Sequence, residues 1–210
     1  TSKARVIIVG NLVVGGSGKT PFTIWLSKYL ESKDKKTTII SSGYGSTISS
    51  PVIIDSLSNP NEVGDEAVLL SNKTKSTVVS SSNRVESTKF CDTSEVDFII
   101  HDDGLQHYSL NRQYEFIIEN TNQRNNNFLL PCGPFREPKF FHKNADFILS
   151  NYTGSEYPGF YSRISGVSSF VNKIKYDLDD KKFSSCILIT AIADDFSLVK
   201  ELKEHDIELI

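Results

Sequence analysis

The chain has 210 residues, of which 38% are hydrophobic, 23% charged and 10% aromatic. This composition is typical of a globular protein and excludes a disordered, collagen-like or disulfide-scaffold chain. The formal net charge of −3 gives no overall positive field, so we expect no nucleic-acid partner. The cysteines Cys91, Cys132 and Cys186 have no Cys-x-x-Cys spacing, which predicts reduced thiols rather than a zinc site or a disulfide framework.

The composition also bears on how the chain relates to its gene product. It contains no methionine, not even at its first position, so we expect it to be a piece of a longer protein. No window approaches the roughly 18 apolar residues that a membrane span needs. A membrane anchor in a preceding stretch would not be visible in this sequence.

Short apolar runs alternate with helical or loop segments along the chain. They lie at residues 4–10, 37–41, 76–80, 96–101, 114–119, 145–150 and 185–190. Because they are rich in Ile, Val and Phe and lack polar alternation, they predict strands buried on both faces of a parallel sheet. Between the first two, the helical spacing of Phe22, Trp25, Leu26, Tyr29 and Leu30 predicts an amphipathic helix. The repeated strand–helix–strand order predicts a doubly wound, mostly parallel α/β sheet.

The composition changes after residue 150, which predicts a division of the chain. We expect a phosphate-loop kinase-like domain at 1–150 and a linker with short strands at 151–183, one of them at 160–164. At 184–210 we expect the beginning of a second α/β domain. That part contains a strand at 185–190, a helix at 196–204 and a strand at 207–210.

A glycine-rich segment follows the first predicted strand directly and opens the predicted helix. It ends in Gly-Gly-Ser-Gly-Lys-Thr at residues 15–20, which matches the phosphate-loop pattern except that Val13 replaces its first glycine. Such a loop turns successive N–H groups inward, and the helix N-terminus adds a field that favours anions. An ordinary turn or helix cap is the alternative interpretation, but the strand–loop–helix context favours a nucleotide site. The residues expected to bind the nucleotide are Val13, Val14, Gly15, Gly16, Ser17, Gly18, Lys19 and Thr20.

Acidic residues occur at two places that suit a magnesium–nucleotide site. Asp102 and Asp103 follow the strand at 96–101, and a phosphate-loop protein needs a carboxylate there to hold Mg²⁺ together with Thr20. An ordinary Asp-Asp-Gly turn is the alternative. Asp65 and Glu66 precede a short apolar run, where they suit either a catalytic role or the first turn of a helix.

Several segments together resemble the tetraacyldisaccharide 4′-kinase family of lipid A biosynthesis. They are VGNLVVGGSGKTPF (9–22), SSGYG (41–45), EVGDEAVLL (62–70), NRVES (83–87), HDDGLQHYSLNR (101–112), FLLPCGPFREP (128–138) and ITAIADDFSLVKEL (189–202). The resemblance implies a phosphate-loop kinase fold with two α/β domains joined by a β-linker. It further implies transfer of the γ-phosphoryl group of ATP, with Mg²⁺, to the 4′-hydroxyl of a tetraacyldisaccharide 1-phosphate. The protein would then act on a lipid disaccharide as a peripheral protein of the cytoplasmic face of the bacterial inner membrane.

The resemblance also assigns roles to individual residues. Lys19 and Asp65 would be catalytic, with Asp65 as the general base on the sugar hydroxyl, and Glu66 would join Thr20, Asp102 and Asp103 at the metal. The implied substrate-binding residues are Tyr44, Arg84, Gln106, His107, Arg136 and Glu137. The chain departs from the family at Ser42, where the family carries arginine. The histidine that the family pairs with its catalytic aspartate would follow residue 210.

Two questions stay open at the level of sequence. A nucleotide-dependent switch with a deviant phosphate loop, or a non-catalytic kinase homologue, is the alternative to a kinase, because the loop alone does not distinguish them. The aromatic and basic residues of the segment 128–143 predict either a loop that touches the membrane or a packed loop with solvated lysines.

Overall fold

The computed structural model describes residues 3–43, 50–55, 57–120, 126–140, 145–151, 158–160, 166–169, 172, 174–177, 185–190 and 195–209. The chain divides into two compact units, Thr1–Phe160 and Tyr161–Ile210, which are described separately here. Among the described residues, no helix is both long enough and apolar enough to traverse a bilayer.

The first unit is built on a seven-stranded sheet with the order β3-β4-β2-β5-β1-β6-β7. Its strands are β1 (Arg5–Gly10), β2 (Thr37–Ser41), β3 (Val52–Ile54), β4 (Thr77–Ser80), β5 (Phe98–Asp102), β6 (Tyr114–Glu119) and β7 (Phe147–Ser150). All neighbours are parallel except β3, which runs antiparallel to β4 at one edge. The sheet confirms the predicted α/β fold, and the strands predicted within this unit all form with ends shifted by at most two residues.

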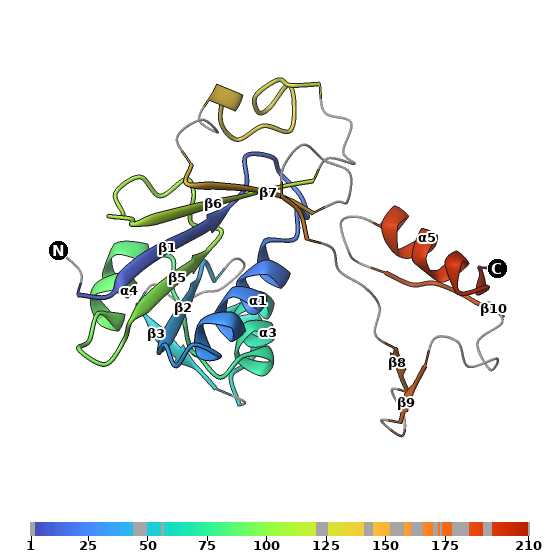
Figure 1. The fold of residues 1–210 in the computed structure, drawn as a ribbon, viewed down its shortest axis with the longest axis horizontal. Coiled ribbons are helices and arrows are strands. Elements are labelled where there is room, and N and C mark those ends of the chain that lie inside the picture. The colour runs from blue at the N-terminus through green and yellow to red at the C-terminus, as the bar shows by residue number, and fades with distance from the viewer. Residues whose placement is uncertain are drawn as a thin grey trace. The chain divides into compact units, whose positions relative to one another are not determined.

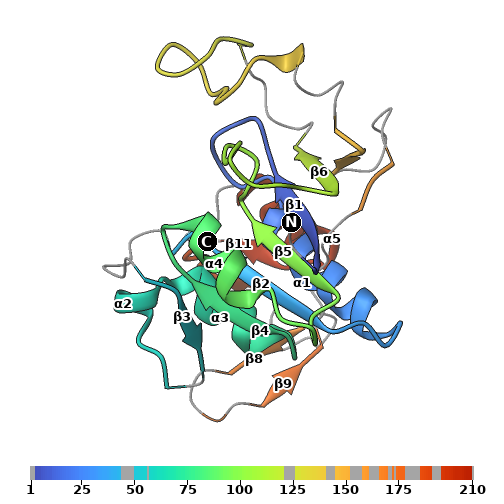
Figure 2. The ribbon, with the colours of Figure 1, turned by 90° about the vertical axis from the view of Figure 1, so that its left-hand side faces the viewer.

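Helices cover both faces of this sheet (Figures 1 and 2). They are α1 (Lys19–Glu31), α2 (Pro60–Val63), α3 (Asp65–Lys73) and α4 (Arg84–Cys91). Alternate residues of the central strands pack on opposite sides, as a period of two requires. Ile7 and Ile100 join Phe22 and Leu26 of α1, whereas Ile8 packs in the cluster that contains Cys91 of α4. This double coverage explains why the central strands read as continuous apolar runs.

Two details of the first unit differ from the sequence-based expectation. Strand β3 was not predicted, because an edge strand of three residues carries too short a pattern to be recognised. The predicted buried face of α1 is only partly buried, since Trp25 and Tyr29 are 56% and 47% exposed. Their rings stack on each other at 5.5 Å, so the aromatic row continues outward from the buried Phe22 instead of entering the core.

The start of the phosphate loop packs tightly against the turn after β5. A side-chain carbon added at Gly10 would lie 2.4 Å from Cβ of Leu105 and 3.2 Å from its backbone nitrogen. We therefore expect Gly10→Ala to lower the free energy of unfolding by about 1–3 kcal/mol, because backbone must move to relieve the overlap. Urea denaturation measures this, and an unchanged midpoint would contradict the close packing of the two segments.

The second unit contains two small sheets. Strands β8 (Val167–Ser168) and β9 (Lys175–Tyr176) form an antiparallel pair. Strands β10 (Ser185–Cys186) and β11 (Glu208–Leu209) are parallel and are connected through α5 (Asp195–Glu204), with Leu202 and Ile207 buried. The predicted strand–helix–strand thus forms, although β10 is shorter than the run at 185–190. Of the strand predicted at 160–164, residues 161–164 lie outside the described residues, and the division into linker and second domain stays a prediction.

Candidate active site

The phosphate-loop segment between β1 and α1 leaves its backbone donors available. Gly15 and Gly18 have φ values of 116° and 90°, a region that side chains disfavour. No backbone N–H of residues 15–20 donates a hydrogen bond to another described residue. Ser17 is buried, and its Oγ finds no partner among the described residues. This arrangement of free N–H groups and an unpartnered hydroxyl at a helix N-terminus is suited to binding an anion.

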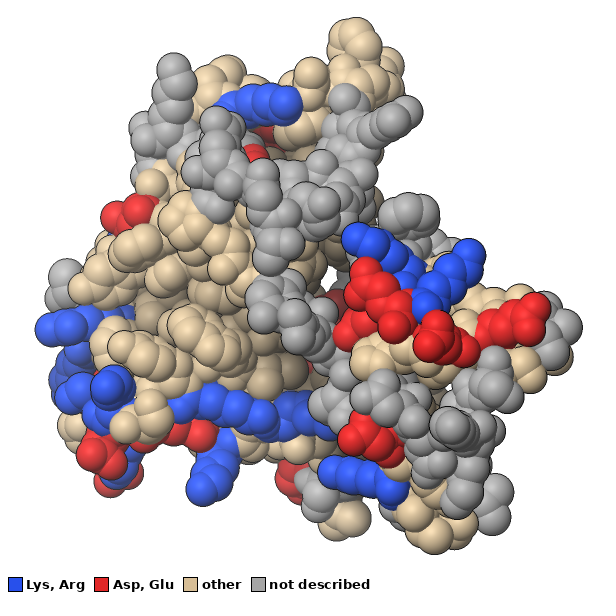
Figure 3. Space-filling model, turned by 45° about the vertical axis from the view of Figure 1, so that its right-hand side comes forward, with Lys and Arg blue, Asp and Glu red and all other residues tan. Residues whose placement is uncertain are grey.

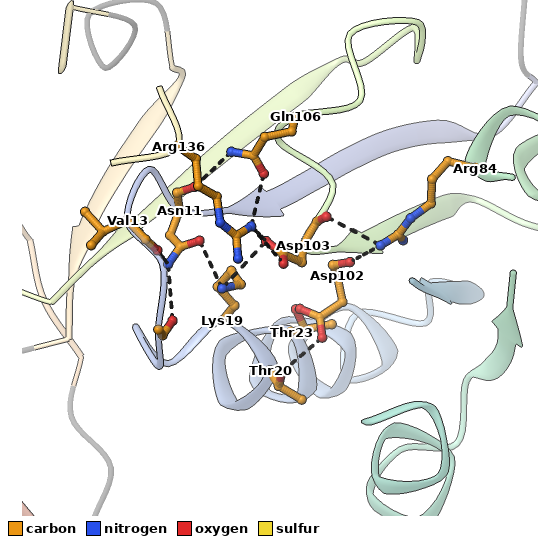
Figure 4. A network of polar contacts seen from close by, with 11 residues as sticks. Asn11, Val13, Lys19, Thr20, Thr23, Arg84, Asp102, Asp103, Gln106 and Arg136 are labelled. Atoms are coloured by element: carbon orange, nitrogen blue, oxygen red, sulfur yellow. Dashed lines mark hydrogen bonds and ion pairs between the residues drawn. The ribbon is translucent and has the colours of Figure 1, made fainter. Parts of the chain in front are cut away.

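Asp102 ties the end of β5 to the first turn of α1 (Figure 4). Its two carboxylate oxygens accept hydrogen bonds from Thr20 Oγ1 at 3.0 Å and from Thr23 Oγ1 at 2.9 Å. Asp102 is only 2% exposed, and burial raises its pKa, although the two threonine hydroxyls oppose this rise. A hydroxyl and a carboxylate in contact beside a phosphate loop are the protein groups that hold Mg²⁺ in nucleotide sites of this kind.

Asp103 lies at the centre of a second set of contacts. Its Oδ1 is 3.6 Å from Lys19 Nζ and 3.0 Å from Arg136 Nη1, and Lys19 also donates to Asn11 Oδ1 at 3.0 Å. Gln106 joins the set, because its Oε1 accepts from Arg136 and its Nε2 donates to the backbone oxygen of Asn11. Two cations and one carboxylate therefore meet directly above the loop (Figure 4).

The segment that carries Arg136 is anchored on the loop by its backbone. Val14 N donates to the carbonyl of Pro134 at 2.8 Å, and Arg136 N donates to the carbonyl of Leu12 at 2.7 Å. From the sequence, Arg136 and the phosphate loop were expected in one site only because of the family resemblance. The structure explains their proximity, because the segment adds a short antiparallel bridge beside the loop between Val13 and Phe135.

Helix α3 brings the other acidic pair toward the same place. Burial, followed by the nearby carboxylates of Asp102 and Asp103, raises the pKa of Glu66, while Lys19 opposes the rise. Glu66 is exposed, and its carboxylate lies close enough to Asp102 and Asp103 for their charges to act on it. Asp65 is exposed at the first position of α3, and its Oδ1 accepts from the backbone N–H of Glu66 at 2.9 Å. The pair begins a helix, as one of the two interpretations made from the sequence expected, whereas its catalytic role stays a prediction.

The other residues assigned to the substrate occupy different settings. Tyr44 lies outside the described residues. His107 is half-buried, and its pKa is lowered by burial and by the charge of Arg84. Glu137 is 7% exposed and borders a cavity of about 400 Å³, and its Oε1 has no hydrogen-bond partner among the described residues. The cavity is lined by Leu12, Leu105, Tyr108, Leu110, Asn111, Arg112, Glu115, Ile117 and Glu137.

Arg84 does not line an open site as the resemblance implied. It is 2% exposed, and its guanidinium donates to the backbone carbonyls of Ile40 and Asp102, each at 2.7 Å. The side chain therefore enters the protein below the ends of β2 and β5. In the described conformation it contacts main chain and leaves no face for a substrate.

Two residues of the site were not singled out from the sequence. Asn11 contacts Lys19, and Thr23 contacts Asp102. Thr23 could have been found from its spacing, because positions three apart on a helix share a face and Thr20 was already assigned. Among the described residues, no three His, Cys, Asp or Glu side chains gather as a metal site. In nucleotide sites Mg²⁺ commonly has few protein ligands, because phosphate oxygens and waters supply the others.

The fold and the site define a phosphate-loop α/β protein with acidic groups at the end of the strand beside the loop. A family model described as Tetraacyldisaccharide-1-P 4'-kinase matches residues 1–210, and the chain belongs to this family. A tetraacyldisaccharide 4'-kinase of Haemophilus influenzae is 41% identical over 155 residues, which are 72% of this chain and 47% of that protein. One from Aliivibrio fischeri is 40% identical over 152 residues, which are 71% of this chain and 46% of that protein. The chain thus spans about half the length of the curated relatives it matches.

A solved structure is similar over nearly the whole chain. LpxK from Aquifex aeolicus, crystallised in complex with ATP, matches with a TM-score of 0.76 at 27% identity. The match covers 99% of this chain and 69% of that one. The family resemblance and the predicted fold are therefore confirmed, whereas the roles of individual residues are proposals.

Proposed function

We propose that this protein transfers the γ-phosphoryl group of ATP to the 4′-hydroxyl of a tetraacyldisaccharide 1-phosphate, the reaction that gives lipid IVA in lipid A biosynthesis. The observation that carries the proposal is the meeting of Lys19, Thr20, Asp102 and Asp103 around a loop with free N–H groups. The family and the names of the curated relatives supply the acceptor.

The described residues fit ATP as the phosphoryl donor. The free N–H groups of residues 15–20 and the unpartnered hydroxyl of Ser17 match the oxygens of a polyphosphate chain. Lys19 adds a positive charge that would neutralise the phosphoryl group as it moves. The related LpxK was crystallised with ATP, which supports the same donor here.

The same residues fit Mg²⁺. Thr20 would bind the ion through its hydroxyl, with Asp102 behind it and Asp103 and Glu66 near the cluster. When bound, the ion would neutralise charge on the phosphates. The protein groups position the two reactants, and phosphoryl transfer depends mainly on such positioning and on electrostatic stabilisation.

We assign the acceptor side of the site to α3 and to the segment at 126–140. Asp65 is exposed at the start of α3 beside Glu66, so its carboxylate is available to take the proton from a sugar hydroxyl. Arg136, Gln106, His107 and Glu137 would line the site for the disaccharide and its phosphate, together with Tyr44. Arg84 is removed from that set because its guanidinium is buried on backbone carbonyls.

The test is transfer of ³²P from γ-labelled ATP to a tetraacyldisaccharide 1-phosphate in detergent micelles, measured on the full-length gene product. Label in the lipid would establish the reaction. ATP hydrolysis or ATP binding without labelled lipid would reject the kinase in favour of a nucleotide-dependent switch or a non-catalytic homologue.

We further propose that the protein acts at the cytoplasmic face of the bacterial inner membrane and that the segment at 126–140 touches the bilayer. Phe128 and Phe140 are 63% and 66% exposed, and Leu129 and Leu130 are exposed between them. Lys139 is exposed nearby, and Glu137, the acidic residue of this segment, is buried. Exposed apolar residues beside a cation suit an interface with anionic lipid.

We expect the double variant Phe128→Ser/Phe140→Ser to bind vesicles that contain anionic lipid at least about ten-fold more weakly, because each side chain contributes roughly 1.5–3 kcal/mol when fully buried. Flotation of the full-length gene product with such vesicles measures this. The matched control is Phe90→Ser, which removes an exposed phenylalanine from α4. Equal flotation of the double variant and the wild type would reject a membrane contact through this segment.

A further inference from the structure

Arg84 is a buried cation whose hydrogen bonds go to main-chain oxygens. It is the first residue of α4, where Asn83 caps the helix by accepting from the N–H of Glu86 at 3.1 Å. From there its side chain reaches between the ends of two adjacent parallel strands. Nη1 donates to Ile40 O of β2 at 2.7 Å, and Nη2 donates to Asp102 O of β5 at 2.7 Å and to Asp103 O at 3.4 Å.

Burying an arginine here is energetically costly unless other interactions compensate for the lost hydration. Burial lowers the pKa of Arg84 to about 10, and the carboxylates of Asp102, Asp103 and Glu66 oppose this change. The side chain therefore stays charged at neutral pH. Its Nε has no partner among the described residues, so the guanidinium is not fully satisfied. An apolar side chain would fill the same space at lower desolvation cost.

Two of the three carbonyls that Arg84 bonds belong to Asp102 and Asp103, whose side chains contact Thr20, Thr23 and Lys19. Figure 4 shows Arg84 on one side of the Asp102–Asp103 turn and Lys19 and Thr20 on the other. Asp103 has a φ of 54°, in the left-handed region that non-glycine residues rarely adopt. Such a conformation persists where surrounding contacts fix it. Here Arg84 bonds its carbonyl, while Lys19 and Arg136 bond its carboxylate.

A second contact fixes the same helix turn to β5. Thr88 Oγ1 donates to Arg84 O at 2.7 Å and lies 3.0 Å from His101 Nε2. Because the single hydroxyl proton goes to that carbonyl, the threonine oxygen accepts from the imidazole N–H. His101 is fully buried, and burial together with the charge of Arg84 holds its pKa well below the ordinary value. Thr88 thus links the backbone of Arg84 to His101 in β5.

We propose that Arg84 is a positioning residue for magnesium-dependent nucleotide binding, which spans the ends of β2 and β5 and fixes the backbone of Asp102 and Asp103. This proposal rests on the proposed function, since it assigns magnesium to the site at Thr20 and Asp102. The fork of the guanidinium is essential to the role, because one donor group must reach two strands at once.

The test compares ATP binding with and without MgCl₂ by isothermal titration on the full-length gene product. For Arg84→Lys and Arg84→Gln we expect that about ten-fold more magnesium or more is needed to reach half of its full effect on ATP affinity. Losses of this size are typical when a group that orients metal ligands is removed. ATP affinity without magnesium should stay within about two-fold, because the loop N–H groups and Lys19 are untouched. A purely structural role of Arg84 would not separate these two quantities.

The matched control is Lys89→Gln, which removes an exposed positive charge from the last turn of the same helix and should change neither quantity. Thermal melts identify variants that do not fold, and Arg84→Lys carries the test if Arg84→Gln is one of them. An unchanged magnesium dependence in a folded variant would overturn the proposal. If the wild type itself does not bind ATP with magnesium, the proposed function fails first, so the two failures are distinguishable.

Discussion

Replacing Lys19 with methionine is expected to lower the rate of phosphoryl transfer to lipid by about 10²–10³-fold, the loss typical of removing one preorganised group that stabilises the transition state. Lys19 begins α1, and its side chain is 11% exposed in contact with Asn11 and Asp103. Methionine keeps an unbranched side chain but carries no charge. The charge of the γ-phosphoryl group would then lose one of the positive groups that balance it.

The labelled-lipid assay on the full-length gene product measures this loss. Lys28→Met is the matched control, because it makes the same change at an exposed position in the last turn of the same helix. The control should transfer phosphate at the wild-type rate. A Lys19→Met rate within about three-fold of wild type would contradict the placement of the phosphoryl group at this lysine, since a three-fold change corresponds to well under 1 kcal/mol.

The core of the fold could be predicted from the sequence because its signals are local. Buried parallel strands read as apolar runs, and β2 and β6 match the runs at 37–41 and 114–119 without a shift. The sequence signal for the loop between β1 and α1 is equally local, since a glycine-rich segment of this pattern between a strand and a helix is typical of phosphate binding. Strand β3 was not predicted because its formation depends on pairing with β4, which is remote in the sequence.

Part of the site could be predicted because parallel strands place their carboxyl ends at the same edge of the sheet. That rule brings the loop after β1 and the aspartates after β5 together, and β1 and β5 are indeed neighbours with Val9 opposite Asp102. It does not say which way a long side chain turns. Arg84 belongs to a recognised motif, yet its guanidinium enters the protein and binds carbonyls instead of facing the site. The direction of that side chain depends on the packing of α4 against β2 and β5, which no short pattern contains.

Asp102 illustrates a conflict between stability and function, and it carries the second large prediction. Its carboxylate is buried, and its pKa is raised, most strongly by burial. A carboxyl group whose pKa is higher in the folded than in the unfolded state favours folding in its protonated form. The favourable contribution is complete below the ordinary pKa of 3.8 and is lost as the pH rises through the folded-state value. Ionisation of Asp102, as the pH rises through that folded-state pKa, therefore opposes folding.

We expect Asp102→Asn to reduce the effect of magnesium on ATP affinity by about 10–100-fold. The melting temperature of the ligand-free protein at pH 7 should not fall. Asparagine has the same shape and no charge, and its amide can still bond the hydroxyls of Thr20 and Thr23. Titration of ATP with and without MgCl₂ measures the first effect, and thermal unfolding without ligands measures the second.

The matched control is Asp97→Asn, an exposed position just before β5 whose carboxylate accepts from Lys36 N at 2.9 Å. It should leave the magnesium effect intact, because it lies at the opposite end of the strand from the loop. Full magnesium dependence in Asp102→Asn would remove Asp102 from the metal site. A lower melting temperature at pH 7 would instead show that the charge of Asp102 stabilises the fold, through Lys19 and the two threonines, more than burial opposes it. The expected pair of results, lost magnesium dependence with undiminished stability, would mark this carboxylate as a group kept for chemistry at the expense of the fold.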